Sequence, residues 1–304
     1  TSADDTLICL DLESGKPRWT FFAEGPIRLA PSVDAGRVYF GSDDGSVYCV
    51  TADTGRPVWR KRTGPREDRI WGNQHMISVW PVRTSVLVDK GYAYWTAGIF
   101  PEEGMFVSRC RADDGSEGWT VKADRPPQGY LLATSDRLFV PTGKTVPSVY
   151  ARADGRLLGQ VSGGREGGSW GLVSPDKASF WFGPGIHGEL FGFHARTSAP
   201  IGNLAGARSL IVAGGHVYYA TDTELVKMRR EGLQEVWRRK HAYPNTLIFA
   251  GGHLFAGGNG GVAAFDGGGK KVWSAPVDGK VFGLAAADGS LFVSTDDGSI
   301  YSFK

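Results

Sequence analysis

Short apolar segments alternate with turns rich in glycine and aspartate along the whole chain. The stretch Leu29–Trp59 shows the pattern: RVYFGS and SVYCVTA are rich in Val, Tyr and Phe, and the turns DAG, DDG and DTG separate them from their neighbours. Valine and aromatic residues favour strands, whereas short clusters of Gly and Asp favour tight turns. The pattern therefore predicts short antiparallel strands joined by tight turns, and no window shows a sustained helical period.

The same unit of four strands recurs along the chain, with a period of about 40 residues. Ser294–Phe303, STDDGSIYSF, nearly copies Gly41–Val50, GSDDGSVYCV. The sequence predicts six complete units, a two-strand fragment at the start and a three-strand fragment at the end. The second strand of the unit is the easiest to recognise, and we expect it at Arg37–Ser42, Tyr92–Ala97, Arg137–Thr142, Ala178–Gly183, His216–Thr221, His253–Gly258 and Ser290–Thr295.

Four antiparallel strands in a repeat of this length predict an all-β fold, the β-propeller, in which each repeat is one blade. We expect residues 1–304 to form a single propeller domain, with a fragment of a longer chain as an open alternative. A tryptophan near the end of the fourth strand is expected to fill the space between neighbouring blades, at Trp19, Trp59, Trp119, Trp237 and Trp273.

The phrase DGSVYCVTADTGRPVW, with its relatives LICLDLESGKPRW and GVAAFDGGGKKVW, resembles the repeat of the pyrroloquinoline-quinone (PQQ)-like propeller superfamily, G-x-V-Y-A-L-D-x-x-T-G-x-x-x-W. The resemblance covers essentially the whole chain and is weak between Lys144 and Asn203. In character it is nearest to the non-catalytic propellers of the outer-membrane assembly lipoprotein type. With this resemblance we favour eight blades, in which the terminal fragments are partial blades. Seven blades, with the fragments merged into one, are the alternative.

Composition and charge exclude several classes of function. Lys and Arg number 34 and Asp and Glu 32, so the net charge of +2 gives no basic footprint for nucleic acid. No apolar run reaches the roughly 18 residues of a transmembrane segment.

Cys9, Cys49 and Cys110 are expected to be buried thiols without disulfides. By resemblance alone, we expect a bacterial protein of the periplasm or cell envelope, or a secreted one.

The order of strands in the unit separates two kinds of loop. The fourth-to-first and second-to-third loops emerge on one face, and the other loops, which are plain turns, emerge on the opposite face. Long loops with charged and aromatic residues concentrate on the first face, which we call the loop-rich face. Because long loops on a rigid scaffold commonly carry binding residues, we expect a protein or glycan partner on this face.

The strongest candidate is Arg66–Arg83, REDRIWGNQHMISVWPVR, a fourth-to-first connection extended by about ten residues over its counterparts. Arg and Trp are the usual anchors of binding surfaces. A loop held down by its own Arg–Asp pairs and a packed Trp is the alternative. Trp80 and Arg83 are expected in or beside the next first strand. The candidate binding residues are Arg66, Asp68, Arg69, Trp71, Asn73, Gln74, His75, Trp80, Arg83, Arg125, Arg165, Trp170, His187 and His241.

We identify no catalytic arrangement in the sequence: the P-loop motif is missing, and the six His are dispersed, which predicts no metal site. The DDG turns at Asp43–Gly45 and Asp296–Gly298 lack the acidic pattern of a calcium loop and are interpreted as turn formers. The quinone dehydrogenases that the chain resembles carry a vicinal Cys–Cys ring, which this sequence lacks. We therefore expect a non-catalytic binding or scaffold propeller without a cofactor. The alternative is a PQQ- and calcium-dependent oxidoreductase, or a lyase or hydrolase, with its site at the channel mouth.

Overall fold

The structure is a computed structural model that describes residues 5–72, 74–161, 167–168, 170–183 and 188–304. It divides into two compact units, residues 1–171 and residues 172–304, and each is described by itself. The fold is all-β: in the described ranges the only helical element is a 3-10 turn, η1 (Pro101–Glu103). A search of the same ranges for a helix long and apolar enough to cross a bilayer finds none.

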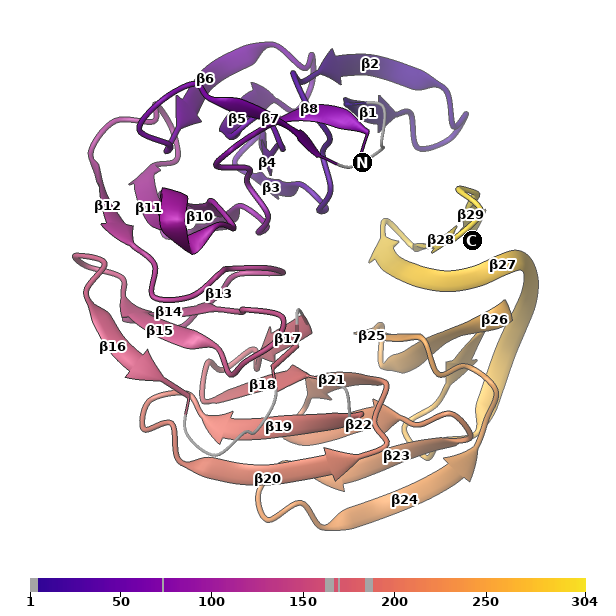
Figure 1. The fold of residues 1–304 in the computed structure, drawn as a ribbon. Coiled ribbons are helices and arrows are strands. Elements are labelled where there is room, and N and C mark those ends of the chain that lie inside the picture. Colours follow the sequence, from indigo (N-terminus) through magenta and orange to yellow (C-terminus); the bar gives the residue numbers. More distant parts are fainter. Residues whose placement is uncertain (1–4, 73, 162–166, 169, 184–187) are drawn as a thin grey trace. The chain divides into compact units, whose positions relative to one another are not determined.

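The first unit consists of antiparallel sheets that follow one another along the chain (Figure 1). A two-stranded sheet pairs β1 (Thr6–Leu10) with β2 (Pro17–Phe22). Three four-stranded sheets follow: β3 (Ser32–Asp34), β4 (Arg37–Gly41), β5 (Ser46–Thr51) and β6 (Pro57–Arg62); β9 (Leu87–Asp89), β10 (Tyr92–Ala97), β11 (Phe106–Arg111) and β12 (Gly118–Lys122); β13 (Leu132–Ala133), β14 (Arg137–Val140), β15 (Ser148–Ala151) and β16 (Leu157–Gln160). An additional hairpin, β7 (Arg69–Gly72) and β8 (His75–Ser78), stands between the first two of these sheets in the sequence.

The next sheet begins with β17 (Trp170–Val173), at the boundary of the two units, and continues in the second unit. Its remaining strands, and those of the following sheet, are β18 (Ser179–Gly183), β19 (Glu189–His194) and β20 (Pro200–Ala205); β21 (Ser209–Ala213), β22 (His216–Ala220), β23 (Glu224–Arg229) and β24 (Glu235–Lys240). The last sheet has five strands, β25 (Thr246–Ala250), β26 (His253–Phe265), β27 (Lys271–Ala287), β28 (Ser290–Thr295) and β29 (Ile300–Phe303).

The long strand β27 joins the last complete repeat to the terminal fragment. Its first part pairs with β26, and its second part, from Val281 to Ala287, pairs with β28. The sequence predicted two separate strands here, a fourth strand and the next first strand, and the structure makes them one continuous strand. In the described part of the chain the order of strands otherwise follows the predicted repeats. The number of blades stays a prediction.

The second and third strands of each sheet carry the core. In β5, Val47, Cys49 and Val50 have no exposed surface, and in β18 Phe180, Trp181 and Phe182 are also fully buried. Such strands are covered on both faces and are therefore apolar without alternation. All three cysteines are free. Burial raises the pKa of the Cys49 thiol to about 11, as expected of a buried thiol, whereas Cys9 is only half-buried.

Four of the five predicted fourth-strand tryptophans connect a sheet to the next one, whereas Trp273 is 37% exposed and packs against Phe303 of β29, with 5.2 Å between the ring centres. Each of the four indole N–H groups donates a hydrogen bond to a carbonyl oxygen in the third-to-fourth turn of the following sheet. The pairs are Trp19 with Ala52 at 3.0 Å, Trp59 with Ala112 at 2.9 Å, Trp119 with Arg152 at 3.2 Å and Trp237 with Gly267 at 3.1 Å. A glycine of the turn lies against the ring: a Cβ at Gly55 would stand 2.7 Å from the Trp19 side chain. The rings therefore pack between neighbouring sheets, as the repeat pattern indicated.

Candidate functional site

The Arg66–Arg83 connection is a folded hairpin and not an extended loop. β7 and β8 pair through Arg69 with Ser78, Ile70 with Ile77, Trp71 with Met76 and Gly72 with His75. Gln74, in the turn between the strands, has a φ of 66°, a conformation that two-residue hairpin turns require. We call β7 and β8 the inserted hairpin. The expectation that Trp80 and Arg83 lie in or beside the next first strand is corrected, because that strand is β9 and begins at Leu87.

The inserted hairpin has one buried and one exposed face. Residues that pair directly across two antiparallel strands project to the same face. Ile77 is only 3% exposed and its partner Ile70 packs against the core of the unit. On the opposite face, Trp71 is 71% exposed and its partner Met76 is 48% exposed. The hairpin therefore presents an apolar pair to solvent while its other face anchors it.

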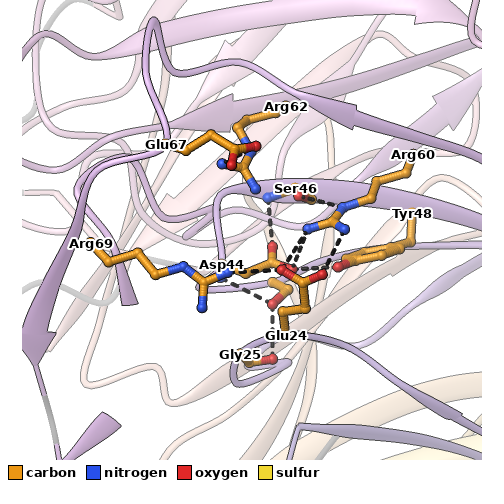
Figure 2. Close-up of polar contacts among 10 residues, drawn as sticks. Glu24, Gly25, Asp44, Ser46, Tyr48, Arg60, Arg62, Glu67 and Arg69 are labelled. Atoms are coloured by element: carbon orange, nitrogen blue, oxygen red, sulfur yellow. Dashed lines mark hydrogen bonds and ion pairs between the residues drawn. The ribbon is translucent and has the colours of Figure 1, made fainter. Parts of the chain in front are cut away.

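Ion pairs hold the hairpin to the neighbouring sheet. The Arg69 guanidinium lies 2.8 Å from the Glu24 carboxylate, which also accepts two hydrogen bonds from Arg60, at 2.9 and 3.1 Å (Figure 2). The hydrogen bonds from Arg60 hold the pKa of Glu24 below its ordinary value. Arg62 adds a further ion pair with Glu67 at 2.9 Å. Arg69, predicted as a binding residue, is thus engaged in positioning the hairpin.

The features of the alternative interpretation, local Arg–Asp pairs and a packed Trp, are also found. Arg66 bonds Asp68 at 2.7 Å, and its guanidinium lies 5.7 Å from the centre of the Trp80 ring. Trp80 is 1% exposed, and its indole N–H donates to the carbonyl oxygen of Glu103 at 2.8 Å. Trp80 is therefore a core residue beneath the hairpin and offers no surface to a partner.

Beside the hairpin, the side chain of Asp44 is almost completely buried in a polar cluster (Figure 2). One carboxylate oxygen accepts the backbone N–H of Ser46 at 2.7 Å. The other accepts the hydroxyl of Tyr48 and lies 3.3 Å from the Arg60 guanidinium. Burial, together with the charge of Asp44, raises the pKa of Tyr48. Arg60 thus connects buried Asp44 to half-exposed Glu24, and through Glu24 to the hairpin.

The neighbouring Asp43 has no exposed surface and lies between two arginines. Its carboxylate is 2.6 Å from Arg28 and 2.8 Å from Arg83. Burial raises the pKa of the Asp43 carboxyl, and the positive charges of Arg83 and Arg28 oppose this shift. Two guanidinium groups around one carboxylate leave an excess of positive charge. The sequence interpretation of Asp43 as a turn former missed this role, since the DDG turn carries no local sign of it.

Two predicted residues, Arg83 and Arg125, meet in one pocket of about 440 Å³ on the loop-rich face of the first unit. Lys144, which the sequence analysis did not select, joins them there. We call this the basic pocket. Its other lining residues are Ile99, Pro126, Pro127, Gln128, Thr142 and Thr145. The signal that could have found Lys144 is the position of its loop, a second-to-third connection next to the Arg125 loop.

The remaining predicted residues are not brought into this group. Trp170 is half-buried at the start of β17. His241 belongs to the second unit and lines a separate pocket of about 340 Å³ with Tyr243. The Tyr243 N–H donates to His241 Nδ1 at 3.0 Å, and burial lowers the pKa of His241. Asn73, Arg165 and His187, also predicted, lie outside the described residues.

Asp43 and Asp44, the buried acidic residues beside the inserted hairpin, do not offer a free ligand set for calcium or for PQQ bound through calcium. Asp43 is held by two arginines, and Asp44 by Tyr48, Ser46 and Arg60. In the ranges that the structure describes, no group of three or more His, Cys, Asp or Glu side chains could hold a metal ion. These residues do not fit the group that the dehydrogenases of the superfamily carry. That the protein works without a cofactor stays a prediction.

Antiparallel four-stranded sheets, repeated along the chain and connected by fourth-strand tryptophans, define this protein as a β-propeller. A family model described as outer membrane protein assembly factor BamB matches residues 1–88 and 225–304, more than half of the sequence. The chain belongs to this family. The comparison with curated proteins finds no match.

Solved structures show the same fold at low sequence identity. BamB from Moraxella catarrhalis has a TM-score of 0.70 and 15% identity, over 99% of this chain and 92% of that chain. Sqt1 from Saccharomyces cerevisiae has a TM-score of 0.74 and 13% identity, over 99% of this chain and 90% of that chain. The computationally designed protein Ika8 has a TM-score of 0.61 and 13% identity, over 92% of this chain and 96% of that chain. Such identities support the propeller fold and carry no information on activity.

Proposed function

We propose that this protein is a non-catalytic scaffold that binds a protein partner through the loop-rich face of its first unit. The observation that carries the proposal is the inserted hairpin, which exposes Trp71 and Met76 side by side. Large exposed apolar residues next to one another on a stable element are typical of interaction surfaces. Trp is among the residues that contribute most to protein interfaces, and the thioether of Met adapts to varied apolar partners.

The buried face of the inserted hairpin supports this role, because it orders the hairpin before a partner binds. Ile70 and Ile77 bury the opposite face, and the Arg69–Glu24 ion pair fixes the first strand. A contact surface that is ordered before the partner arrives loses less conformational entropy on binding. A protein partner suits the exposed pair better than a glycan does, because Met76 beside the ring offers a sugar no hydrogen-bonding group.

The chain belongs to a family described as outer membrane protein assembly factor BamB, and from this we extend the proposal to the location of the protein in the cell. We place the protein at the bacterial cell envelope, on the periplasmic side, with an envelope protein as its partner. This placement rests on the family description and on the fold shared with BamB from Moraxella catarrhalis.

The test is capture of partners from an envelope extract of the source organism, with the wild-type protein and two double variants as immobilised baits. The first variant is Trp71→Ala with Met76→Ala. The matched control is Leu12→Ala with Val33→Ala, since these side chains are 54% and 68% exposed in the first unit but lie next to plain turns. We expect the hairpin variant to lose its specific partner about thirtyfold or more, as for an interface hot spot worth about 2 kcal/mol. The control should retain it.

Equal capture by the hairpin variant and the wild type would contradict the proposal, provided that both proteins unfold at the same temperature. A separate measurement addresses the enzyme alternative. Thermal unfolding with added PQQ and calcium should match unfolding without them. A ligand that binds only the folded protein raises the melting temperature, so a clear rise would favour the oxidoreductase instead.

A further inference from the structure

We propose that the basic pocket binds a Glu or Asp side chain from an extended segment of the partner protein. The inference rests on the proposed function and deepens it, because it gives the partner a chemistry: a carboxylate on a short apolar stem. It begins from three cations in one pocket, Arg83, Arg125 and Lys144.

Backbone hydrogen bonds between loops fix the shape of the basic pocket. The N–H of Gly129 donates to the carbonyl oxygen of Arg83 at 3.2 Å, and the N–H of Ser85 donates to Gly129 at 3.0 Å. These bonds join the connection before β9 to the connection before β13. The N–H of Gln128 donates to Pro141 at 2.9 Å and joins the latter to the connection after β14. The backbone of the loops that carry the cations is therefore connected before a ligand binds, which lowers the cost of ordering the site.

The charges around the pocket leave it positive, and none of the described residues that line it is acidic. Arg83 shares Asp43 with Arg28. Arg125 is 3.8 Å from Asp124, a carboxylate that already accepts hydrogen bonds at 2.8 Å from Ser148 and from Tyr150.

Lys144 completes the set of cations. It is exposed and has no ion pair with any residue that the structure describes. A carboxylate is the complementary group, because arginine binds it through two parallel hydrogen bonds and lysine adds a point charge.

Apolar groups and hydroxyls line the rest of the pocket. Ile99, Pro126 and Pro127 supply apolar surface, and Thr142, Thr145 and Gln128 supply polar groups. A volume of about 440 Å³ is at the small end for ligand pockets. It suits one or two side chains, with the methylene groups of Glu against the apolar wall and the carboxylate beside the cations.

The basic pocket and the inserted hairpin are attached to the same residue. Ser78, the last residue of β8, donates its backbone N–H to the carbonyl oxygen of Asp43 at 2.8 Å. The side chain of Asp43 binds Arg83, which lines the pocket. A partner that covers Trp71 and Met76 on the hairpin can therefore extend an acidic segment into the pocket, so we assign the carboxylate to a protein and not to a free metabolite.

The test is fluorescence polarisation with a fluorescein-labelled peptide, GSEEGS, amidated at its C-terminus. The neutral peptide GSQQGS and free glutarate, used as a competitor, are the ligand controls. The protein variant is Arg125→Gln with Lys144→Gln. Arg83 is left in place because its loss would leave Asp43 without one of its two partners. The matched protein control is Arg156→Gln, which removes an exposed cation from a third-to-fourth turn of the same unit.

We expect GSEEGS to bind at least about tenfold more tightly than GSQQGS. The double variant should weaken it about tenfold or more, since each partly exposed charge pair contributes up to about a factor of five. Arg156→Gln should leave the affinity within about twofold. Raising sodium chloride from about 50 mM to about 500 mM should weaken binding by screening. All variants should keep the wild-type melting temperature.

Equal affinity for GSEEGS and GSQQGS, or an affinity that the double variant does not change, would overturn the inference. Competition by glutarate at the concentration of the peptide would overturn the assignment to a protein segment and indicate a site for a free carboxylic acid. The outcome is separable from that of the capture experiment. If Trp71→Ala binds the peptide and the hairpin variant still captures the partner, the proposed contact of the partner with the hairpin is contradicted. The inference about the basic pocket would not be contradicted by that result.

Discussion

Substitution of the buried carboxylate in the Asp44 cluster tests whether this cluster stabilises the first unit. Asp44→Asn keeps the shape and one oxygen, so the hydrogen bond from the Ser46 N–H is retained. The other oxygen becomes an NH2 group, which faces the Tyr48 hydroxyl and the Arg60 guanidinium. Both are donors in the wild-type protein. The change therefore removes a charge-assisted hydrogen bond and an ion pair without leaving a cavity.

The expected loss follows from the burial of the site. A hydrogen bond to a charged group contributes about 1.5–3 kcal/mol, whereas exposed ion pairs contribute less than about 1 kcal/mol. Asp44 is 1% exposed, but Arg60 keeps its two hydrogen bonds to Glu24, so its charge is not left unpaired. We therefore expect Asp44→Asn to lower the free energy of unfolding by about 2–3 kcal/mol.

The chain supplies a matched control for this substitution. Asp297 stands in the same local sequence, DDGS, and accepts the N–H of Ser299 at 2.9 Å as Asp44 accepts that of Ser46. Asp297 is exposed, so Asp297→Asn should cost less than about 0.5 kcal/mol. Urea unfolding followed by tryptophan fluorescence gives both values. Equal losses for the two substitutions would refute the reasoning, because they would assign the effect to the turn and not to the buried cluster.

Two further predictions concern the second unit and the contact between sheets. Burial lowers the pKa of His241. Its contribution to stability is therefore complete above the ordinary pKa of about 6.5 and is lost as the pH falls through the lowered value. Melting temperatures between about pH 7 and pH 5 should fall less for His241→Gln than for the wild type. The carbonyl oxygen of Ala112 accepts hydrogen bonds from Trp59 at 2.9 Å and from Tyr39 at 3.1 Å. In urea unfolding, Tyr39→Phe should lower the free energy of unfolding by about 1 kcal/mol. The double variant with Trp59→Phe should lose more than the sum of the two single variants, since only the double variant leaves the carbonyl unpaired. A pH response unchanged in His241→Gln, or strictly additive losses, would contradict the respective prediction.

Much of the fold could be predicted because its determinants are local. Strands such as β4 and β10 are short runs of Val, Tyr, Phe and Trp, and the turns between them need Gly at positive φ, as at Gly36 and Gly91 with φ of 74° and 76°. These features are visible in a window of about ten residues. The contacts of four tryptophans could be predicted from the repeat itself, since each of these rings packs against the third-to-fourth turn of the next unit.

The inserted hairpin was missed although the sequence contains its pairing. Ile70 and Trp71 face Ile77 and Met76 across a two-residue turn. In the sequence the two residues between the strands are Asn and Gln, not the Asn-Gly that marks a hairpin, so the segment was interpreted as a loop. The pair of Arg66 with Asp68 is two residues apart and was predictable. Pairs between distant residues, such as Arg69 with Glu24, depend on how sheets and hairpin pack and leave no local signal.

The two DDG turns show why the same sequence acquires different roles. Both turns have a glycine at positive φ, 86° at Gly45 and 89° at Gly298. A Cβ at Gly45 would lie 2.6 Å from the hydroxyl oxygen of Ser78 and 3.0 Å from the carbonyl oxygen of Trp80, whereas one at Gly298 would meet nothing within 4 Å. The segment after the inserted hairpin therefore covers the first turn. Its coverage excludes water from Asp43 and Asp44, which then require arginine partners. The insertion thus both presents the apolar pair and creates the buried charge cluster that holds Arg83 at the basic pocket.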